Sequence, residues 1–346
     1  MNQLKISNES KDSDPNIVYL NINIKGSNDP EKVVEALYSE NRTVAILDNP
    51  NDYILGLVRF SVPSMYIPIF RWATQFPQPF TDDSLRVYMQ YSGVTVFSPL
   101  SFILKTNDPL LSNERLIWNF QDFIDIVNEA IVDAFTLISA VPGFPVGINV
   151  PRLVLDSASN LIYLYVDVAF QTNFINIGFS RLLYSYFPSF ATFEDVLAVP
   201  GKTIYRIQLY DNIINNVTYL GNPAYKLSQE FPTLSLWSNV DKLLFVSNSI
   251  PIDTELEGSQ TNIQSRVIFD FVLDNSQLND RTNIIYYSQG NQRYYDLLSN
   301  YPMKRTDISV QILFKDGTTL PLKLLSTDTL SLKLQFIKKG SMTNLN

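Results

Sequence analysis

The chain of 346 residues contains no cysteine and no histidine. Without cysteine it can form no disulfide and present no thiolate nucleophile. Without histidine it lacks the imidazole proton shuttle and the usual sets of zinc ligands. Ser-His-Asp and Cys-His catalytic arrangements are therefore excluded. The mechanisms that remain use carboxylates, lysine or tyrosine, and a glycosidase with a pair of carboxylates is the realistic example.

The carboxylates offer few candidates for such a pair. Asp82-Asp83, Glu194-Asp195 and the acidic run at 253–257 all lie in polar, turn-like sequence. Such a setting is typical of solvated surface carboxylates, whereas a catalytic acid usually needs an apolar setting that shifts its pKa. We therefore predict that the chain is not an enzyme, and that it has no catalytic site, cofactor or metal.

Nucleotide and nucleic-acid binding have little support. The stretch "PGKT" at 200–203 lacks the glycine that a phosphate loop needs five residues before Gly201, where Val196 stands. The following "TIYRIQLY" alternates like a strand, but the motif requires the start of a helix. The net charge of −8 and the isoelectric point near 4.7 argue against nucleic-acid binding by the chain as a whole.

Hydropathy predicts no membrane span. The longest apolar stretch, at 130–150, carries Asp133 and two prolines, which disqualify it as a spanning helix. The opening "MNQLKISNESKDSDP" has no apolar segment of the kind found in signal peptides. We expect a protein that is made in the cytosol, with a flexible, charged arm at 1–14.

Short alternating runs dominate the chain. About fifteen can be recognised as strands from period-two alternation, and no repeat of fixed length is present. Leu330, Leu332, Leu334 and Phe336 form the clearest example, since polar residues separate them. A short helix is expected at 29–40. With 45% hydrophobic and 17% charged residues the chain can bury a large core, and the pattern predicts an all-β sandwich.

One segment has a helical period. From Asn113 the sequence predicts an amphipathic helix that Pro142-Gly143 ends, with four acidic residues on the polar side (Asp122, Asp125, Glu129 and Asp133). The apolar positions recur every three to four residues: Phe120, Phe123, Ile124, Val127, Ile131, Phe135 and Ile138.

The C-terminal sequence predicts three further strands. In "ISVQILFKDGTTLPLKL", from Ile308, the pair Asp316-Gly317 predicts a two-residue turn with positive φ at both positions. The last strand ends at Lys338 and Lys339, which we interpret as charges that protect an edge strand from stray pairing. An alternative interpretation is that these two lysines contact packaged DNA on an inner surface.

Four stretches carry a resemblance to a known family: "NPNDYILGLVRFSVPSMYIPIF", "NFQDFIDIVNEAIVDAF", "FPTLSLWSNVDKLLFVSNSIP", and the run from "IIYYSQGNQRYYDLLSNYP" to "LKLQFIKK". In this order they resemble the minor capsid (penton-type) proteins of virophages and polinton-like small icosahedral DNA viruses. The similarity spans most of the chain, and none of the motifs is catalytic. No Arg-Gly-Asp triplet is present, so nothing about a receptor is implied.

The resemblance implies a fold and an organisation. The fold is a jelly-roll antiparallel β-sandwich with an insertion that carries the one long amphipathic helix. We expect the jelly-roll capsid domain at 15–340, the insertion at 106–200 and a tail at 341–346. The implied function is that of a structural virion protein, a minor capsid or penton subunit at the vertex of an icosahedral shell.

The resemblance also implies partners. These are the chain itself, as a homopentamer, and a neighbouring major capsid protein, in a virion assembled in the host cytoplasm. Two alternatives stay open. One is a double jelly-roll major capsid protein, since the expected strands nearly fill two rolls. The other is a carbohydrate-binding or carbohydrate-cleaving β domain that uses Trp72, Trp118 and Trp237 as platforms.

Capsid sandwiches keep their cores intact, so subunit contacts must come from edges, loops and insertions. Two aromatic segments, starting at Met65 and at Ser180, have suitable residues on proline-fixed backbone. The alternative is that both segments cap the ends of the core. The candidate interface residues are Phe70, Trp72, Phe76, Phe80, Leu182, Tyr184, Tyr186, Phe187 and Phe190.

Overall fold

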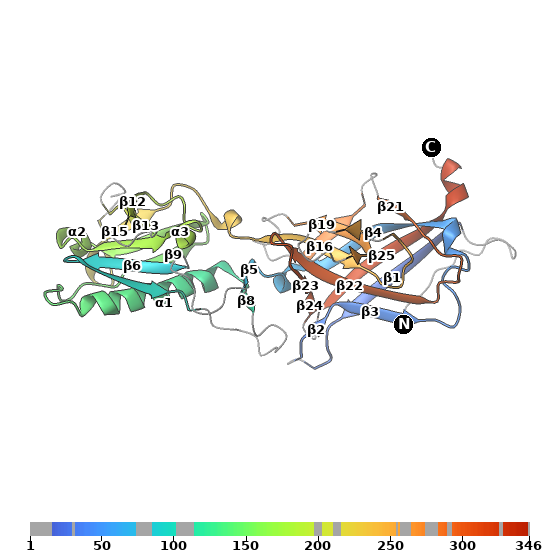
Figure 1. Ribbon diagram of the computed structural model, residues 1–346, viewed down its shortest axis with the longest axis horizontal. Coiled ribbons are helices and arrows are strands. Elements are labelled where there is room, and N and C mark those ends of the chain that lie inside the picture. Colours follow the sequence, from blue (N-terminus) through green and yellow to red (C-terminus); the bar gives the residue numbers. More distant parts are fainter. Residues whose placement is uncertain are drawn as a thin grey trace. The chain divides into compact units, whose positions relative to one another are not determined.

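The chain folds into two compact units (Figure 1). Unit 1 comprises Met1–Pro68 and Asn239–Asn346, and unit 2 comprises Ile69–Ser238. The expected arm at 1–14 lies outside the described residues. The computed structural model describes residues 16–29, 32–73, 85–101, 114–196, 203–209, 216–253, 255–256, 264–273, 283–288, 293–324 and 328–344.

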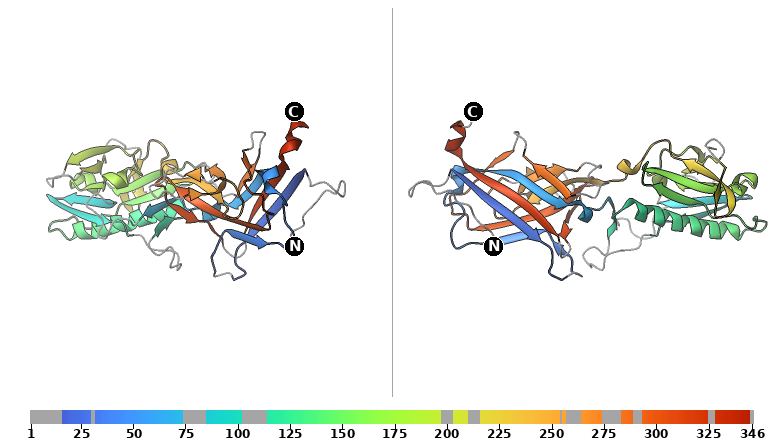
Figure 2. Two further views of the ribbon diagram at one scale, coloured as in Figure 1. Left: turned by 45° about the vertical axis from the view of Figure 1, so that its right-hand side comes forward. Right: turned by 180° about the vertical axis from the view of Figure 1, so that it is seen from behind.

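Unit 1 is a sandwich of two antiparallel sheets (Figure 2). The first sheet has the order β1 (Ile17–Lys25), β25 (Thr329–Lys338), β4 (Tyr53–Pro63), β20 (Asn283–Tyr287), and β21 (Tyr294–Asp296) also pairs with β4. The second has the order β19 (Val267–Val272), β16 (Val240–Val246), β22 (Arg305–Phe314), β23 (Thr319–Pro321), and β3 (Leu37–Asn41) also pairs with β22. Two short pairs complete the unit: β2 (Val34–Glu35) with β24 (Lys323–Leu324), and β17 (Glu255–Leu256) with β18 (Gln264–Ser265).

Period-two alternation builds the core of this sandwich. In β1, every second residue from Val18 to Ile24 is buried, because successive side chains of a strand point to opposite faces. The neighbouring β25 alternates in the same way, and the predicted inward residues from Leu330 to Phe336 are all buried. Side chains of both sheets belong to one buried cluster. The expected antiparallel β-sandwich is therefore present.

The last strand is not an edge strand. β25 lies between β1 and β4, with Lys338 opposite Tyr53 and its backbone N–H bonded to the Asn16 carbonyl at 2.8 Å. The interpretation of Lys338 and Lys339 as edge protection is therefore wrong. A local alternation pattern does not tell which strands flank it. Lys339 instead lies 2.8 Å from the Asp296 carboxylate, and these two side chains are 41% and 65% exposed.

The predicted hairpin at Gly317 exists, but its turn is longer than expected. The Gly317 N–H donates to Phe314 O at 2.8 Å, and the Phe314 N–H donates to Thr318 O at 2.9 Å. The loop thus has three residues, Lys315 to Gly317, and only Gly317 has a positive φ, of 82°. This is a β-turn followed by a residue in the left-handed region, the usual form of a three-residue hairpin loop.

The helix expected at 29–40 is absent from the described part of that segment. Residues 34–35 and 37–41 form β2 and β3 instead. The Ala36 N–H donates to Leu322 O at 2.7 Å, and β3 pairs with β22 from Leu37 to Asn41. Ladder hydrogen bonds to distant strands thus override the weak local preference of a short segment.

Unit 2 also contains two antiparallel sheets. The first has the order β12 (Thr192–Val196), β13 (Thr203–Ile207), β11 (Asn176–Ser180), β6 (Arg86–Tyr91), β7 (Val94–Pro99). The second has the order β14 (Asn216–Tyr219), β15 (Asn222–Ser228), β10 (Leu161–Asp167), β9 (Arg152–Asp156). A separate pair joins β5 (Phe70–Ala73) to β8 (Glu114–Ile117), and two short helices are α2 (Ala169–Thr172) and α3 (Arg181–Tyr184).

The long amphipathic helix is α1 (Phe120–Ser139), which packs against β6, β7 and β9. It begins seven residues later than the sequence indicated (Asn113 to Phe120), because residues 114–117 pair with β5. The Asn119 side chain caps the helix by accepting the Asp122 N–H at 2.8 Å. The predicted apolar side is buried or half-buried, and Asp125, Glu129 and Asp133 are exposed. The amphipathic pattern therefore identified the correct face of the helix.

The insertion in unit 1 is larger than the predicted range of 106–200. β6 and β7 precede this range, and they pair with each other while β6 also pairs with β11. β15 follows the range and pairs with β10. All of these strands therefore belong to unit 2, which extends from Ile69 to Ser238. At the other end of the chain, the expected tail at 341–346 begins within a 3-10 helix, η5 (Lys339–Asn344).

Candidate subunit interfaces

The aromatic segment after β11 belongs largely to the core of unit 2. Ser180 caps α3 by accepting the Leu183 N–H at 3.4 Å. The chain then turns inward, and Phe187 and Phe190 become 0% and 2% exposed. A fully buried side chain cannot contact a neighbouring subunit, so the interface prediction is wrong for these two residues. The alternative interpretation, that the segment caps the end of the core, is correct for them.

Leu182, Tyr184 and Tyr186 are less buried than these two phenylalanines. Tyr184 stacks on Tyr205 with ring centroids 4.3 Å apart, and its hydroxyl donates to Pro188 O at 2.9 Å. Burial raises the pKa of Tyr186 to about 12. Leu182 is 36% exposed, so among the predicted residues of this segment it has the most accessible side chain. For Leu182, Tyr184 and Tyr186 an interface role stays a prediction.

The structure describes only part of the proline-rich segment that starts at Met65. Phe70 and Trp72 lie in β5, where they pair with Ile117 and Arg115 of β8. Phe76 and Phe80 lie outside the described residues, so their role in an interface also stays a prediction.

Trp237 is a core residue and no carbohydrate platform. It is 2% exposed, its indole N–H donates to Tyr186 O at 2.7 Å, and its ring meets Phe123 edge-on at 4.9 Å. An indole enclosed in this way offers no face to a sugar ring. The carbohydrate-binding alternative therefore loses this platform.

The carboxylates that the sequence singled out are described only in part. Asp195 makes an ion pair with Arg206 at 3.4 Å on the surface of unit 2, and Asp82 and Asp83 lie outside the described residues. Where the structure describes the chain, no three Asp or Glu side chains gather as metal ligands would. Among the described helices, none has both the length and the apolarity to cross a bilayer.

Sequence reasoning missed the apolar side chains on the two sides of the sandwich in unit 1. Among the described strands, β19 and β20 lie at one side and β1 and β3 at the other. Phe269 of β19 and Tyr286 of β20 pack together at 4.9 Å, and β1 contacts β3. Exposed apolar residues occur on both sides: Val272, Ile285 and Tyr287 on the first, and Ile17, Tyr19 and Leu37 on the second. In the sequence, the only signal was that apolar residues occupy both faces of these strands.

Comparison with known proteins identifies relatives over nearly the whole chain. The sequence model of the family described as "Sputnik minor capsid protein V18/19" matches residues 18–338. Two curated relatives come from the Sputnik virophage. Protein V18, which has no described function, is 27% identical over 43% of this chain and 98% of its own length. "Structural protein V19" is 30% identical over 37% of this chain and 69% of its own length.

Two solved structures share the fold. A chain in the cryo-EM structure of the Sputnik virophage is 25% identical with a TM-score of 0.74, and the match covers 94% of this chain and 99% of that one. The mavirus penton protein is 18% identical with a TM-score of 0.65, covering 93% and 99%. Both matches include unit 1 and unit 2, so the sandwich with its large insertion is the fold of both structures.

Proposed function

Because the chain belongs to the family of the Sputnik minor capsid protein V18/19 and is therefore a structural component of a virion, we propose that it forms the five-fold vertex of an icosahedral shell as a ring of five copies. The likeness of its fold to the mavirus penton protein motivates the choice of vertex. Around this ring, each copy contacts a neighbouring major capsid protein, and assembly takes place in the host cytoplasm.

The observation that carries the proposal is the presence of two different apolar sides on one sandwich. A closed ring needs a heterologous contact, in which one surface of a subunit meets a different surface of the next. Val272, Ile285 and Tyr287 would supply the first surface, and Ile17 and Leu37 the second. Strands at the sides also carry backbone groups that face away from their sheet and can bond to a neighbour. Together, these features give a ring contact without opening either core.

A structural role without catalysis accounts for the composition. The chain has no histidine and no cysteine, and Asp195 is held by Arg206. The test is an assay of glycosidase activity on the purified chain. Activity that disappears in Asp82→Asn or Asp195→Asn would contradict a purely structural role.

Negative-stain class averages of the purified chain test the ring directly. We expect five-fold rings for the wild type. Changing Ile285 and Tyr287 together to Glu should give monomers that keep the circular dichroism spectrum, since both side chains are more than half exposed. Leu137→Glu, at a similarly exposed position on α1 in unit 2, is the matched control and should leave the rings intact. Three-fold particles would instead indicate the double jelly-roll major capsid arrangement.

A contact with packaged DNA at the end of β25 is a finer part of the proposal. It rests on Lys338 and Lys339, and Lys339 already has an acidic partner in Asp296. Phosphate contacts weaken as salt is added, because DNA binding releases counterions. Changing both lysines to Glu should therefore abolish a salt-sensitive gel shift with double-stranded DNA. A wild-type chain that shows no shift at low salt lacks this contact.

A further inference from the structure

Four turns meet at one end of unit 2, and we call them the apical turns. They are 92–93 between β6 and β7, 143–149 after α1, 168–175 around α2, and 220–221 between β14 and β15. Figures 1 and 2 show α2 and the end of α1 at this same end of the unit. The Tyr91 hydroxyl donates to Gly143 O at 2.6 Å, which joins the first turn to the second.

A buried carboxylate fastens the other turns together. Asp167 is 4% exposed and accepts the backbone N–H of Ala169 at 2.9 Å, the N–H of Asn149 at 3.1 Å and the Nδ2 group of Asn222 at 2.8 Å. Asn222 Nδ2 also donates to Gly147 O at 2.8 Å. Hydrogen bonds to a buried carboxylate are strong, so the backbone of these turns is fixed.

The apical turns hold most of the left-handed residues of the described chain. Gly93, Gly143, Gly147 and Gly221 have positive φ, as do Ser92 (48°), Phe174 (57°) and Leu220 (49°). Elsewhere in the described residues only Asn160 and Gly317 adopt this conformation. For phenylalanine and leucine it is unfavourable, because the Cβ crowds the backbone. Residues held in such a conformation at a surface often serve a function.

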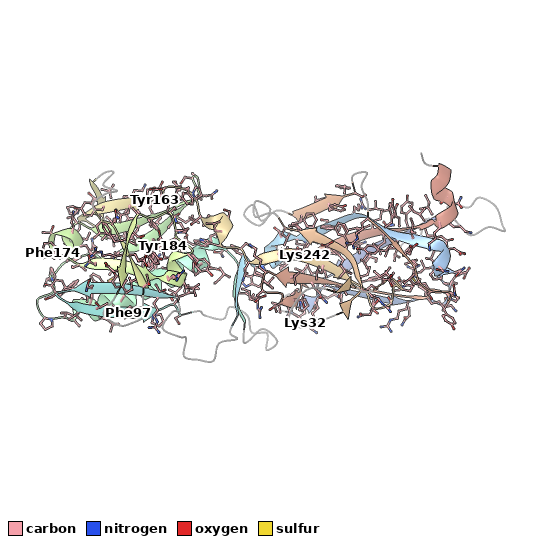
Figure 3. All side chains as sticks on the ribbon, turned by 45° about the horizontal axis from the view of Figure 1, so that its top comes forward. Lys32, Phe97, Tyr163, Phe174, Tyr184 and Lys242 are labelled. Atoms are coloured by element: carbon pink, nitrogen blue, oxygen red, sulfur yellow. The ribbon has the colours of Figure 1, made fainter. Side chains whose placement is uncertain are left out.

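The same two strained residues project large apolar side chains into solvent. Phe174 is 84% exposed and Leu220 is 72% exposed, and Val146 on the neighbouring turn is 101% exposed. Figure 3 shows Phe174 at this end of unit 2. Neither burial in the core nor backbone preference explains why these positions are apolar. An external apolar environment would explain it.

Apart from the buried Asp167, the sequence of the apical turns carries no formal charge. No Asp, Glu, Lys or Arg occurs at 87–104, 134–151, 168–180 or 212–225. Charged side chains are costly to place in hydrocarbon, whereas the rim of a protein–protein interface is polar and often charged. The projecting side chains lie on turns without charge, although Asp133 and Arg152 line the same surface hollow as Leu220, and Arg206 lines the same hollow as Phe174. The turns themselves thus fit a neutral lipid surface better than a protein partner. Tyr91 and Tyr219 beside it are suited to the level of the headgroups.

We propose that the apical turns insert Val146, Phe174 and Leu220 into the headgroup–acyl boundary of a zwitterionic lipid bilayer. The inference stands on unit 2 alone and does not require the proposed pentamer. Three side chains give a weak and reversible attachment, as for other shallow insertions. Several copies in one particle would strengthen it through avidity.

Flotation of the full chain with phosphatidylcholine vesicles tests this inference. Asparagine tolerates the left-handed region, so Phe174→Asn with Leu220→Asn keeps the turn geometry. We expect this variant to melt at the same temperature as the wild type or higher, but to bind vesicles at least tenfold more weakly. Phe231→Asn with Leu236→Asn changes two exposed apolar residues outside the apical turns, and this control should bind like the wild type.

The salt and lipid dependence then identify the kind of attachment. Binding through uncharged side chains should not weaken in high salt, and phosphatidylserine should not strengthen it, since the chain has a net charge of −8. Three results overturn the inference: no binding of the wild type to vesicles, binding that requires phosphatidylserine and is lost in salt, or full binding by the asparagine variant. If light scattering without lipid shows that the asparagine variant loses an oligomer, the apical turns contact another copy of the chain instead.

Discussion

Gly178, in the middle of β11, is the glycine at which a side chain would be tolerated least. It pairs with Tyr88 of β6 on one side and with Arg206 of β13 on the other. A Cβ added here would lie 2.1 Å from Cε1 of Tyr88 and 2.4 Å from the backbone oxygen of Tyr205. Ordinary contacts of this kind are about 3.4–4 Å apart. Both neighbours would therefore have to move by about 1 Å or more.

The expected cost of Gly178→Ala follows from these two contacts. Overpacking a core costs about 1–3 kcal/mol. The Tyr88 ring is 1% exposed and the Tyr205 oxygen is part of the backbone, so neither can swing aside and the upper end of this range applies. Replacing glycine by alanine also lowers the conformational entropy of the unfolded chain, which stabilises the folded state by about 0.4–1 kcal/mol. We expect a net loss of about 2 kcal/mol, or about 4–8 °C in the melting temperature of a unit of this size.

Urea unfolding followed by tryptophan fluorescence measures this cost in unit 2 specifically. The chain has three tryptophans, Trp72, Trp118 and Trp237, and all of them lie in unit 2. Leu137→Ala is the control, since it changes an exposed side chain on α1 in the same unit, and it should change stability by less than about 0.5 kcal/mol. If Gly178→Ala unfolds at the same urea concentration as the wild type, Tyr88 does not pack as closely over Gly178 as described.

Three other predictions concern single contacts. Gly317→Val should cost about 1–3 kcal/mol, because valine is strained at a φ of 82°, and an unchanged melting temperature would contradict the turn. Asn119→Ala should cost about 1 kcal/mol through the lost cap on the Asp122 N–H, whereas Asn119→Asp should retain most of the stability in the same urea titration. Partial burial raises the pKa of Asp307. Hydrogen bonds from residues 247–249 lower this pKa, and together they outweigh the effect of burial, so the pKa lies below its usual range. Its stabilisation is therefore complete above the unfolded pKa of about 3.9 and is lost as the pH falls through the folded pKa, so Asp307→Asn should flatten the acid limb of a stability–pH curve.

Local patterns predicted which side chains are buried, but not which strands are neighbours. The alternation from Leu330 to Phe336 placed these residues in the core, and the helical period did the same for the inner face of α1. The same patterns gave no sign that β25 lies between β1 and β4, because those pairings join residues about 300 positions apart. For this reason the charges at Lys338 and Lys339 were misinterpreted. The bounds of the insertion were misplaced for the same reason, since they depend on the pairing of β6 and β15.

Composition likewise could not tell a core aromatic from an interface aromatic. Phe187 and Leu182 lie five residues apart in the same segment, yet the first is fully buried and the second is 36% exposed. Both interpretations require large apolar side chains on ordered backbone. The direction of the chain after α3 decides between them, and this direction is set by packing against Trp237 and Phe123.

The apolar stretch at 130–150 shows where hydropathy stops being informative. The hydropathy averaged over its length is high, as in a membrane span, but Asp133 and two prolines rule out a spanning helix. The structure divides it into two parts with different environments. Ala130, Ala134 and Ile138 are buried along α1, and Val146 projects from an apical turn. An average cannot separate these parts, because it counts a buried and an exposed apolar side chain alike. The feature that distinguishes the second part is the absence of charge, which recurs in three segments distant in sequence that fold to the same end of unit 2. Charge-free runs that converge in space are thus a better guide to an exposed apolar surface here than the hydropathy of any one of them.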